Sequence, residues 1–185
     1  MFDEVYLQPN LNINLRTKSI DGLVNTGHSC IFDIADHALV FMLRGINQSW
    51  KQPVAFYFVK GATKTFDLKN IVESVIRAIH NNTDFCILAT VSDKGAPNVT
   101  AMSSWSRDFG REGEFIFKVD EHEIFHIFDP PHLLKCFRNN FINKDIHFEG
   151  KIAKWSDLRL LYELDGTDPE GKICKRLTES HIYPV

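Results

Sequence analysis

Residues 122–132, "HEIFHIFDPPH", contain side chains whose types and spacing could bind a metal ion. His122, Glu123 and His126 form a His-Glu-x-x-His motif, and His132 follows six residues after the second histidine. In zinc endopeptidases this spacing places two histidines one helical turn apart around the ion, while the glutamate polarises a water molecule. The motif therefore raises a specific hypothesis, zinc-dependent hydrolysis, which the surrounding residues have to support.

The residues around the motif argue against a zinc site. The metzincin pattern requires a glycine three residues after the second histidine, but Asp129 occupies that position and two prolines follow it. A residue before proline favours an extended conformation, which does not suit the turn that would return His132 to the ion. The preceding residues are aromatic and β-branched, which predicts a strand, and all three methionines precede the motif, so no Met-turn follows. We therefore interpret His122 and His126 as ordinary strand or loop residues.

Two acidic positions in or after predicted strands form a better candidate site. Asp3, with its neighbour Glu4, lies in a strand-like run at 2–8, and Asp93 directly follows an apolar strand at 84–92. Ligand sites collect at the carboxyl ends of strands in open α/β sheets. If these strands are neighbours about 4.8 Å apart, Asp3 and Asp93 would share the divalent cations of two-metal phosphodiester chemistry. Hard oxygen ligands favour Mg²⁺ or Mn²⁺ over zinc. The residues alone leave two alternatives open, a turn or helix cap for Asp93 and a solvated acid for Asp3.

Hydrophobic patterning predicts the elements that would position these acids. Two apolar runs, 37–46 and 52–61, are joined by a connection of hairpin size and should pair antiparallel. Apolar residues recur at helical spacing over 65–82, and the strand at 84–92 is as apolar as a buried parallel strand. A right-handed crossover would place it parallel to an earlier strand in one sheet. Further extended segments are predicted at 18–27, 114–119, 123–129 and 148–155, and further helices at 99–109, 130–142 and 156–166.

This order predicts an α/β fold with a mixed sheet, which is compatible with a ribonuclease H-like fold and also with a generic α/β domain. The 185 residues suit one domain, or one domain and part of a second. The net charge of −3 and the lack of a long basic run give no electrostatic indication of nucleic acid. No apolar run approaches the roughly 20 residues that span a membrane. The four cysteines lack C-x-x-C spacing, which predicts reduced thiols in an intracellular protein: Cys30, Cys86, Cys136 and Cys174.

Four segments follow one another along the chain: "ADHALVFMLRGINQSWKQPVAFYF" (35–58), "ATVSDKGAPN" (89–98), "FDPPHLLKCFRNNF" (128–141) and "LTESHIYPV" (177–185). Together they resemble the P-element-type transposases, a family that includes members with an N-terminal THAP zinc finger. The resemblance implies a ribonuclease H-like α/β domain, with a mixed sheet and helices on both faces. It also implies that the family cuts and joins DNA with two metal ions held by two Asp and one Glu. A GTP-binding domain would be inserted between the second Asp and this final Glu.

Carried over to this chain, the resemblance assigns Asp3 as the first catalytic and metal-binding acid, with Glu4 in reserve, and Asp93 as the second. No residue matches the final Glu, because Glu149 and Glu163 come too early in the chain. We therefore expect a transposase fragment, truncated at both ends and inactive alone. The alternative is a non-catalytic, domesticated remnant that binds DNA or protein.

The same resemblance divides the chain at residue 142. Residues 1–142 would form a ribonuclease H-like core, incomplete at its C-terminal side, and residues 143–185 would begin the inserted GTP-binding-type domain. It implies Mg²⁺ or Mn²⁺ as cofactor, transposon-end DNA as partner and a nuclear location. GTP binding is doubtful for this chain, since most of the insertion is missing, and the oligomeric state is open.

The helix predicted at 130–142 has two different sides. Its apolar residues, Leu133, Leu134, Phe137 and Phe141, share one face, and Lys135 and Arg138 lie on the other. Packing of the apolar face on the sheet is one expectation, and contact of Lys135 and Arg138 with DNA phosphates is the sharper one. Asp129 could cap this helix or act as an accessory metal ligand.

Overall fold

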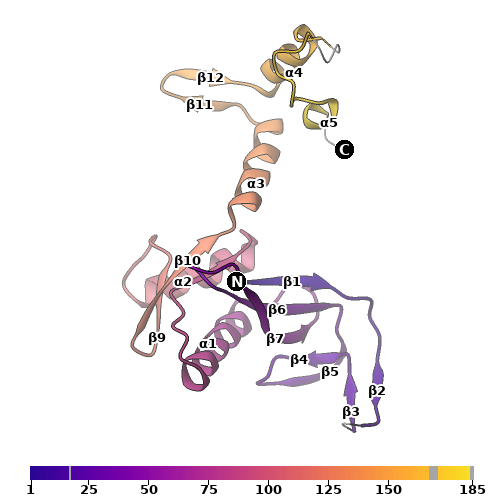
Figure 1. Cartoon of the computed structure of the whole chain (residues 1–185), viewed down its shortest axis with the longest axis vertical. Coiled ribbons are helices and arrows are strands. Elements are labelled where there is room, and N and C mark those ends of the chain that lie inside the picture. The colour runs from indigo at the N-terminus through magenta and orange to yellow at the C-terminus, as the bar shows by residue number, and fades with distance from the viewer. Residues whose placement is uncertain (17, 167–170, 184–185) are drawn as a thin grey trace. The chain divides into compact units, whose positions relative to one another are not determined.

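The computed structural model describes residues 1–16, 18–166 and 171–183 (Figure 1). The chain forms two compact units, Met1–Pro130 and Pro131–Val185. None of the described helices is long and apolar enough to cross a membrane.

The first unit contains a five-stranded antiparallel sheet in which β6 and β7 form the longest ladder. Their pairing confirms the hairpin predicted from the two apolar runs. In this sheet, whose strand order is β1-β6-β7-β4-β5, every pair of neighbouring strands is antiparallel. The strands are β1 (Phe2–Tyr6), β6 (His37–Arg44), β7 (Lys51–Val59), β4 (Leu23–Asn25) and β5 (Cys30–Ile34).

The prediction of a single strand at 18–27 is wrong, because the extended conformation is interrupted at Gly22. This glycine has a φ of +106°, and a Cβ on it would collide with the carbonyl oxygen of Asn10. The break separates β3 (Ser19–Asp21), which pairs with β2 (Asn12–Asn14), from β4 in the main sheet. The sequence prediction also missed β2 and β5, which are short and largely exposed.

A second, three-stranded sheet carries the strand that precedes Asp93. It is made of β8 (Ala89–Ser92), β10 (His122–Phe128) and β9 (Ile116–Val119), with β8 parallel and β9 antiparallel to β10. The parallel partner of β8 is therefore a later strand, not the earlier one that was expected. β1 lies beside β8, although the two belong to separate ladders.

Two helices, α1 (Thr65–Asn82) and α2 (Ala96–Asp108), pack against each other and share the core of this unit. α1 has the predicted bounds and buries the predicted apolar face, while Pro97 in the first turn lets α2 begin earlier than expected. The Trp105 ring of α2 stacks on Phe117 of β9 at 4.0 Å between centroids. The mixed α/β class predicted from the sequence is confirmed. The core includes Phe2, Leu39, Phe41, Leu68, Ile71, Val72, Met102, Val119 and Ile124.

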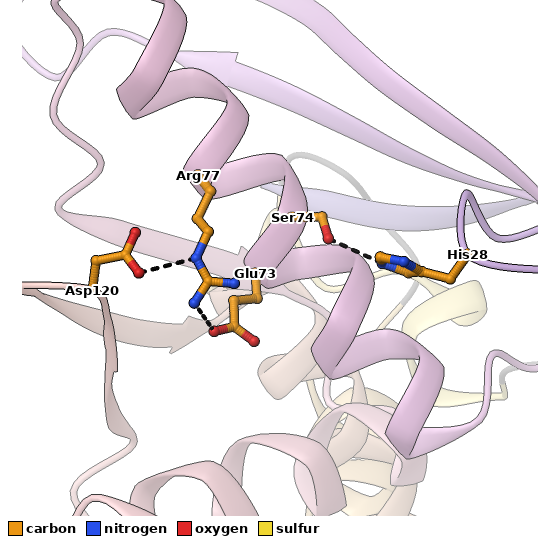
Figure 2. Close-up of polar contacts among 5 residues, drawn as sticks. All are labelled: His28, Glu73, Ser74, Arg77 and Asp120. Atoms are coloured by element: carbon orange, nitrogen blue, oxygen red, sulfur yellow. Dashed lines mark hydrogen bonds and ion pairs between the residues drawn. The ribbon is translucent and has the colours of Figure 1, made fainter.

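Polar contacts hold the outer side of α1 to its neighbours. Figure 2 shows Arg77 between Glu73, one helical turn earlier, and Asp120, which follows β9, at 2.6 Å and 3.0 Å. His28 Nε2, in the β4–β5 turn, lies 3.1 Å from the hydroxyl of Ser74 and so joins α1 to that turn (Figure 2). The Arg77 pairs are substantially exposed, so each contributes only about 0–1 kcal/mol to the free energy of unfolding.

The second unit is built around Trp155. Its indole Nε1 donates a hydrogen bond to the carbonyl of Ile182 at 3.1 Å, and Phe141 meets its ring edge-to-face. The segment predicted as extended is a hairpin that turns at Glu149 and Gly150, both with positive φ. The elements are α3 (Pro130–Asn143), β11 (Ile146–Phe148), β12 (Lys151–Ala153), α4 (Trp155–Leu164) and α5 (Glu179–Ile182).

Candidate active site

Asp93 lies in the turn between β8 and α2, and its carboxylate is held by that turn. Oδ1 accepts hydrogen bonds from the backbone N–H of Gly95 at 3.1 Å and from Nδ2 of Asn98 at 2.5 Å. Among the described residues, these hydrogen bonds to the carboxylate both go to Oδ1, which leaves Oδ2 available to a ligand. The turn-forming role and a metal-binding role for Asp93 are therefore compatible.

Gly95 is the N-cap of α2 and lies against this carboxylate. Its φ of −63° is open to any residue, but a Cβ would approach Oδ1 of Asp93 to 3.1 Å and Oδ2 to 3.4 Å. Glycine is therefore favoured here by the close approach of the side chain and not by backbone conformation. The N-terminus of α2 also favours negative charge at this position.

Asp3 and Glu4 point to opposite sides of β1. Phe2 and Glu4 alternate with Asp3, and Phe2 belongs to the helix-covered core, so Asp3 lies on the other face of the strand, where it is exposed. Glu4 accepts a hydrogen bond from the backbone N–H of Thr63 at 2.7 Å through Oε1, which ties β1 to the chain after β7. Because Glu4 has this local role, Asp3 is the better candidate for the first acid.

The N-terminal end of β1 lies level with the middle of β8. The rings of Phe2 and His126 are 6.3 Å apart, and His126 is in register with Thr90 on β8. β1 and β8 are therefore near each other, and binding of common ions by Asp3 and Asp93 stays a prediction. The described residues contain no group of three or more His, Cys, Asp or Glu side chains that could hold a metal ion.

Asp129 is the residue next to Asp93 across the parallel ladder. Phe128 is in register with Ser92, and the backbone N–H of Asp129 donates to the carbonyl of Ser92 at 2.8 Å. Two acids thus follow adjacent strand ends, whose backbones are about 4.8 Å apart. The role of Asp129 as an accessory ligand also stays a prediction.

The His-Glu-x-x-His motif lies on β10, as the strand prediction expected. Four residues of strand separate His122 from His126 by about 13 Å along the chain, too far for both rings to bind one zinc ion. The ring of His122 lies 4.5 Å from that of His80, whereas His126 is buried between Thr90 and Ser92. His132 lies in the first turn of α3, as predicted.

His126 is the residue of this region that sequence reasoning undervalued. Its Nδ1 lies 2.9 Å from the hydroxyl of Thr90 and its Nε2 lies 3.3 Å from that of Ser92. Burial lowers the pKa of His126 to about 4, so the ring is neutral at pH 7. A signal was available in the sequence: Thr90 and Ser92 alternate with apolar residues in "ATVS", which marks a polar face on an apparently apolar strand.

Lys135 and Arg138 are exposed on α3. Arg138 donates from Nε and Nη2 to the side-chain oxygen of Asn139, at 3.3 Å and 3.2 Å. The apolar residues Leu134 and Phe137 of the same helix are also exposed. Glu163, on α4, accepts a long hydrogen bond of 3.4 Å from the Tyr183 hydroxyl.

A large cavity of the first unit is lined by neither of the two acids. It has a volume of about 810 Å³, is mainly apolar and is lined by residues of β6, α1 and the segment 85–91. Asp129 is among its lining residues, but neither Asp3 nor Asp93 is. Asp3 is exposed on β1 and Asp93 is half-buried in the turn after β8, so the two acids are not part of this cavity.

Comparison with known proteins decides the family. Residues 1–106 match the family described as TNP-like, RNase H N-terminal domain. The chain belongs to this family. The matched residues run from β1 through most of α2, so the family region contains Asp3, Asp93 and Asn98, whereas Asp129, Lys135 and Arg138 lie outside it.

Two relatives agree with the family assignment. The Transposable element P transposase of Drosophila melanogaster is 28% identical over 156 residues, which cover 82% of this chain and 19% of that protein. The solved Drosophila P element transposase strand transfer complex has the same fold, with a TM-score of 0.71, 24% identity, and coverage of 98% of this chain and 37% of that chain. The chain thus spans about a fifth of the curated relative that it matches, and its predicted ribonuclease H-like architecture is confirmed.

Proposed function

We propose that this chain is part of the catalytic core of a P-element-type DNA transposase, whose full length performs metal-dependent DNA cleavage and strand transfer. The observation that supports this most directly is the Asp93 turn. The family region includes both proposed acids. Within it, the carboxylate of Asp93, directly after β8, is held through Oδ1, while Oδ2 is available to a ligand. Transposon-end DNA is the proposed partner, and the proposed location is the nucleus.

Asp3 and Asp93 would hold Mg²⁺ or Mn²⁺. The donors fit these ions, because both are hard carboxylate oxygens. When bound, such ions supply charge stabilisation for the attacking and leaving oxygens of a phosphodiester. Gly95 and Asn98 hold the Asp93 carboxylate in one orientation before an ion arrives.

The 185 residues alone are proposed to bind metal without cutting DNA. The family resemblance implies a third carboxylate, and neither Glu149, in a hairpin turn, nor Glu163, on α4, is assigned to it. Residues 143–185 are proposed as the start of an inserted GTP-binding-type domain.

Mn²⁺ titration of the chain by isothermal calorimetry tests the site. Wild-type protein should bind, and the isosteric variants Asp3→Asn and Asp93→Asn should each weaken affinity at least tenfold, because each removes a charged ligand. Asp84→Asn, at an exposed acid in the segment before β8, is the matched control and should leave affinity unchanged. Wild-type affinity in both site variants would overturn the proposal.

A second candidate function, non-catalytic DNA binding, is favoured by the composition of α3. Residues 130–144 contain Lys135, Arg138 and Lys144 and no acidic residue. A Lys135→Ala/Arg138→Ala variant should weaken binding to a labelled DNA duplex and flatten its dependence on salt, by about one unit of log–log slope for each phosphate that the variant no longer neutralises. Equal affinity and salt dependence in the two proteins would exclude this surface.

A further inference from the structure

Three polar side chains on β8 and β10 are buried together next to the turn that contains Asp93. Thr90, Ser92 and His126 are only 6%, 3% and 7% exposed. The ring of His126 lies between the two hydroxyls, with its Nδ1 2.9 Å from Thr90 Oγ1 and its Nε2 3.3 Å from Ser92 Oγ. Ser92 Oγ lies 2.8 Å from the backbone carbonyl oxygen of Asp93. Buried polar groups are costly unless they are satisfied, and here each group has a partner.

The direction of these hydrogen bonds follows from the number of protons available. A carbonyl oxygen can only accept, so Ser92 donates its single hydroxyl proton to Asp93. Ser92 must then accept from His126, which requires a proton on Nε2. In a neutral ring Nδ1 carries no proton, so it accepts from the hydroxyl of Thr90. The donors therefore run in one direction, from Thr90 through His126 and Ser92 to Asp93.

The neutral state of the ring is consistent with this order. Burial lowers the pKa of His126 to about 4, so at pH 7 the imidazole has one N–H and one acceptor nitrogen. A protonated ring would have two N–H groups, and Nδ1 could no longer accept from Thr90.

We propose that His126 is a positioning residue for Asp93, acting through the hydroxyl of Ser92 on the Asp93 backbone. Asp93 is then fixed from two sides. Ser92 holds its carbonyl, while Gly95 and Asn98 hold its carboxylate. This inference rests on the proposed function, because the orientation of the carboxylate matters for binding of the divalent cation. Groups that orient a ligand in this way commonly change metal affinity 10- to 100-fold when they are removed.

The decisive experiment compares two buried serines in the full 185-residue chain. Ser92→Ala removes the hydroxyl that joins His126 to Asp93. Ser106→Ala is the matched control, because Ser106 is also fully buried and its hydroxyl also donates to a backbone carbonyl, that of Arg111. Mn²⁺ affinity measured by electron paramagnetic resonance should fall about tenfold in Ser92→Ala and stay at the wild-type value in Ser106→Ala. If Asp93→Asn weakens Mn²⁺ binding, equal affinities in the two serine variants would overturn the proposal.

A second readout does not require metal. Long-range ¹H–¹⁵N NMR of His126 should show the tautomer protonated on Nε2, and an Nδ1-protonated ring would overturn the hydrogen-bond order. The side-chain amide resonances of Asn98 should shift in Ser92→Ala and not in Ser106→Ala, because of these two serines only Ser92 donates to the Asp93 backbone. Unchanged Asn98 resonances in both variants would contradict the positioning role, whether or not the protein binds metal.

The two proposals fail in different ways. If Asp93→Asn abolishes Mn²⁺ binding while Ser92→Ala binds as wild type, the metal site stands and the role of His126 is wrong. If Asp93→Asn binds as wild type, the metal site is wrong, and the NMR readout alone decides whether His126 positions the turn.

Discussion

Nδ2 of Asn98 lies 2.5 Å from Oδ1 of Asp93, so a side chain in the first turn of α2 fixes the carboxylate that ends β8. The same amide lies 3.4 Å from the Asp93 carbonyl. Asp93 and Asn98 are only five positions apart in the sequence. One strand–turn–helix segment therefore carries the proposed metal ligand and also orients it. The direct hydrogen bonds to this carboxylate are therefore local in sequence, whereas His126 reaches the Asp93 backbone from β10 through Ser92.

Replacement of Asn98 by alanine should lower Mn²⁺ affinity about tenfold, because the carboxylate loses the donor that orients Oδ1. The free energy of unfolding should fall by only about 1 kcal/mol, the usual contribution of a hydrogen bond. Calorimetric titration and urea unfolding measure the two effects. Asn81→Ala, at an exposed position of α1, is the control. Loss of stability with unchanged metal affinity would show that Asn98 serves the turn alone.

Replacement of Gly95 by alanine should also weaken Mn²⁺ binding. The new Cβ would lie 3.1 Å from Oδ1 of Asp93, which is tighter than most contacts of real Cβ atoms, so the carboxylate must move by a few tenths of an ångström. The backbone accepts alanine, since the φ of residue 95 is −63°, and circular dichroism should show unchanged helix content. Wild-type Mn²⁺ affinity in this variant would mean that the carboxylate adjusts freely.

The sequence predicted the parts of the fold that local periodicity controls. The apolar spacing of α1 and the paired runs of β6 and β7 are recovered with nearly correct bounds, because each burial pattern is contained in the segment itself. The partner of β8 could not be read in this way. Its apolar composition indicates a buried parallel strand but not which strand is its partner, and β10 lies more than thirty residues later in the chain.

β10 shows why the role of His126 was missed. Alternation places Glu123, Phe125 and Ile127 on one face of the strand and Ile124 with His126 on the other. The first face looks as apolar as the second, yet the structure buries the histidine face and exposes Phe125 and Ile127. That choice depends on the hydroxyls of β8, which can satisfy a buried imidazole, and so on a neighbour that the β10 sequence does not reveal.

Two apolar substitutions in the first unit should have different effects on stability. Ile71, on α1, is fully buried, so Ile71→Ala should reduce the free energy of unfolding by about 2–5 kcal/mol through reduced burial and a cavity. Phe56, on β7, is 64% exposed. Phe56→Ala should therefore change the free energy of unfolding by less than about 1 kcal/mol. Urea unfolding followed by circular dichroism measures both. Similar decreases in the two variants would mean that the face bearing Phe56 is covered in solution.

Stability should fall in acid because His126 is buried without charge. Burial lowers its pKa in the folded protein to about 4, and the nearby N-terminal ammonium acts in the same direction. An unfolded histidine titrates near 6.5, so between pH 6.5 and pH 4 the unfolded state binds the proton and the folded state does not. The contribution of His126 to stability is therefore complete above pH 6.5 and is lost as the pH falls towards 4, by about 3 kcal/mol.

The measurement is the free energy of unfolding in urea at pH 7 and at pH 4.5, for wild type and for His126→Gln. Other groups titrate in both proteins, including His80, whose pKa is also lowered by burial, so the difference between the two proteins isolates His126. His147→Gln, at an exposed position of β11, should keep the full wild-type pH dependence. If His126→Gln keeps it as well, the imidazole is not held neutral between Thr90 and Ser92, and the one-directional hydrogen-bond order that ends at Asp93 fails with it.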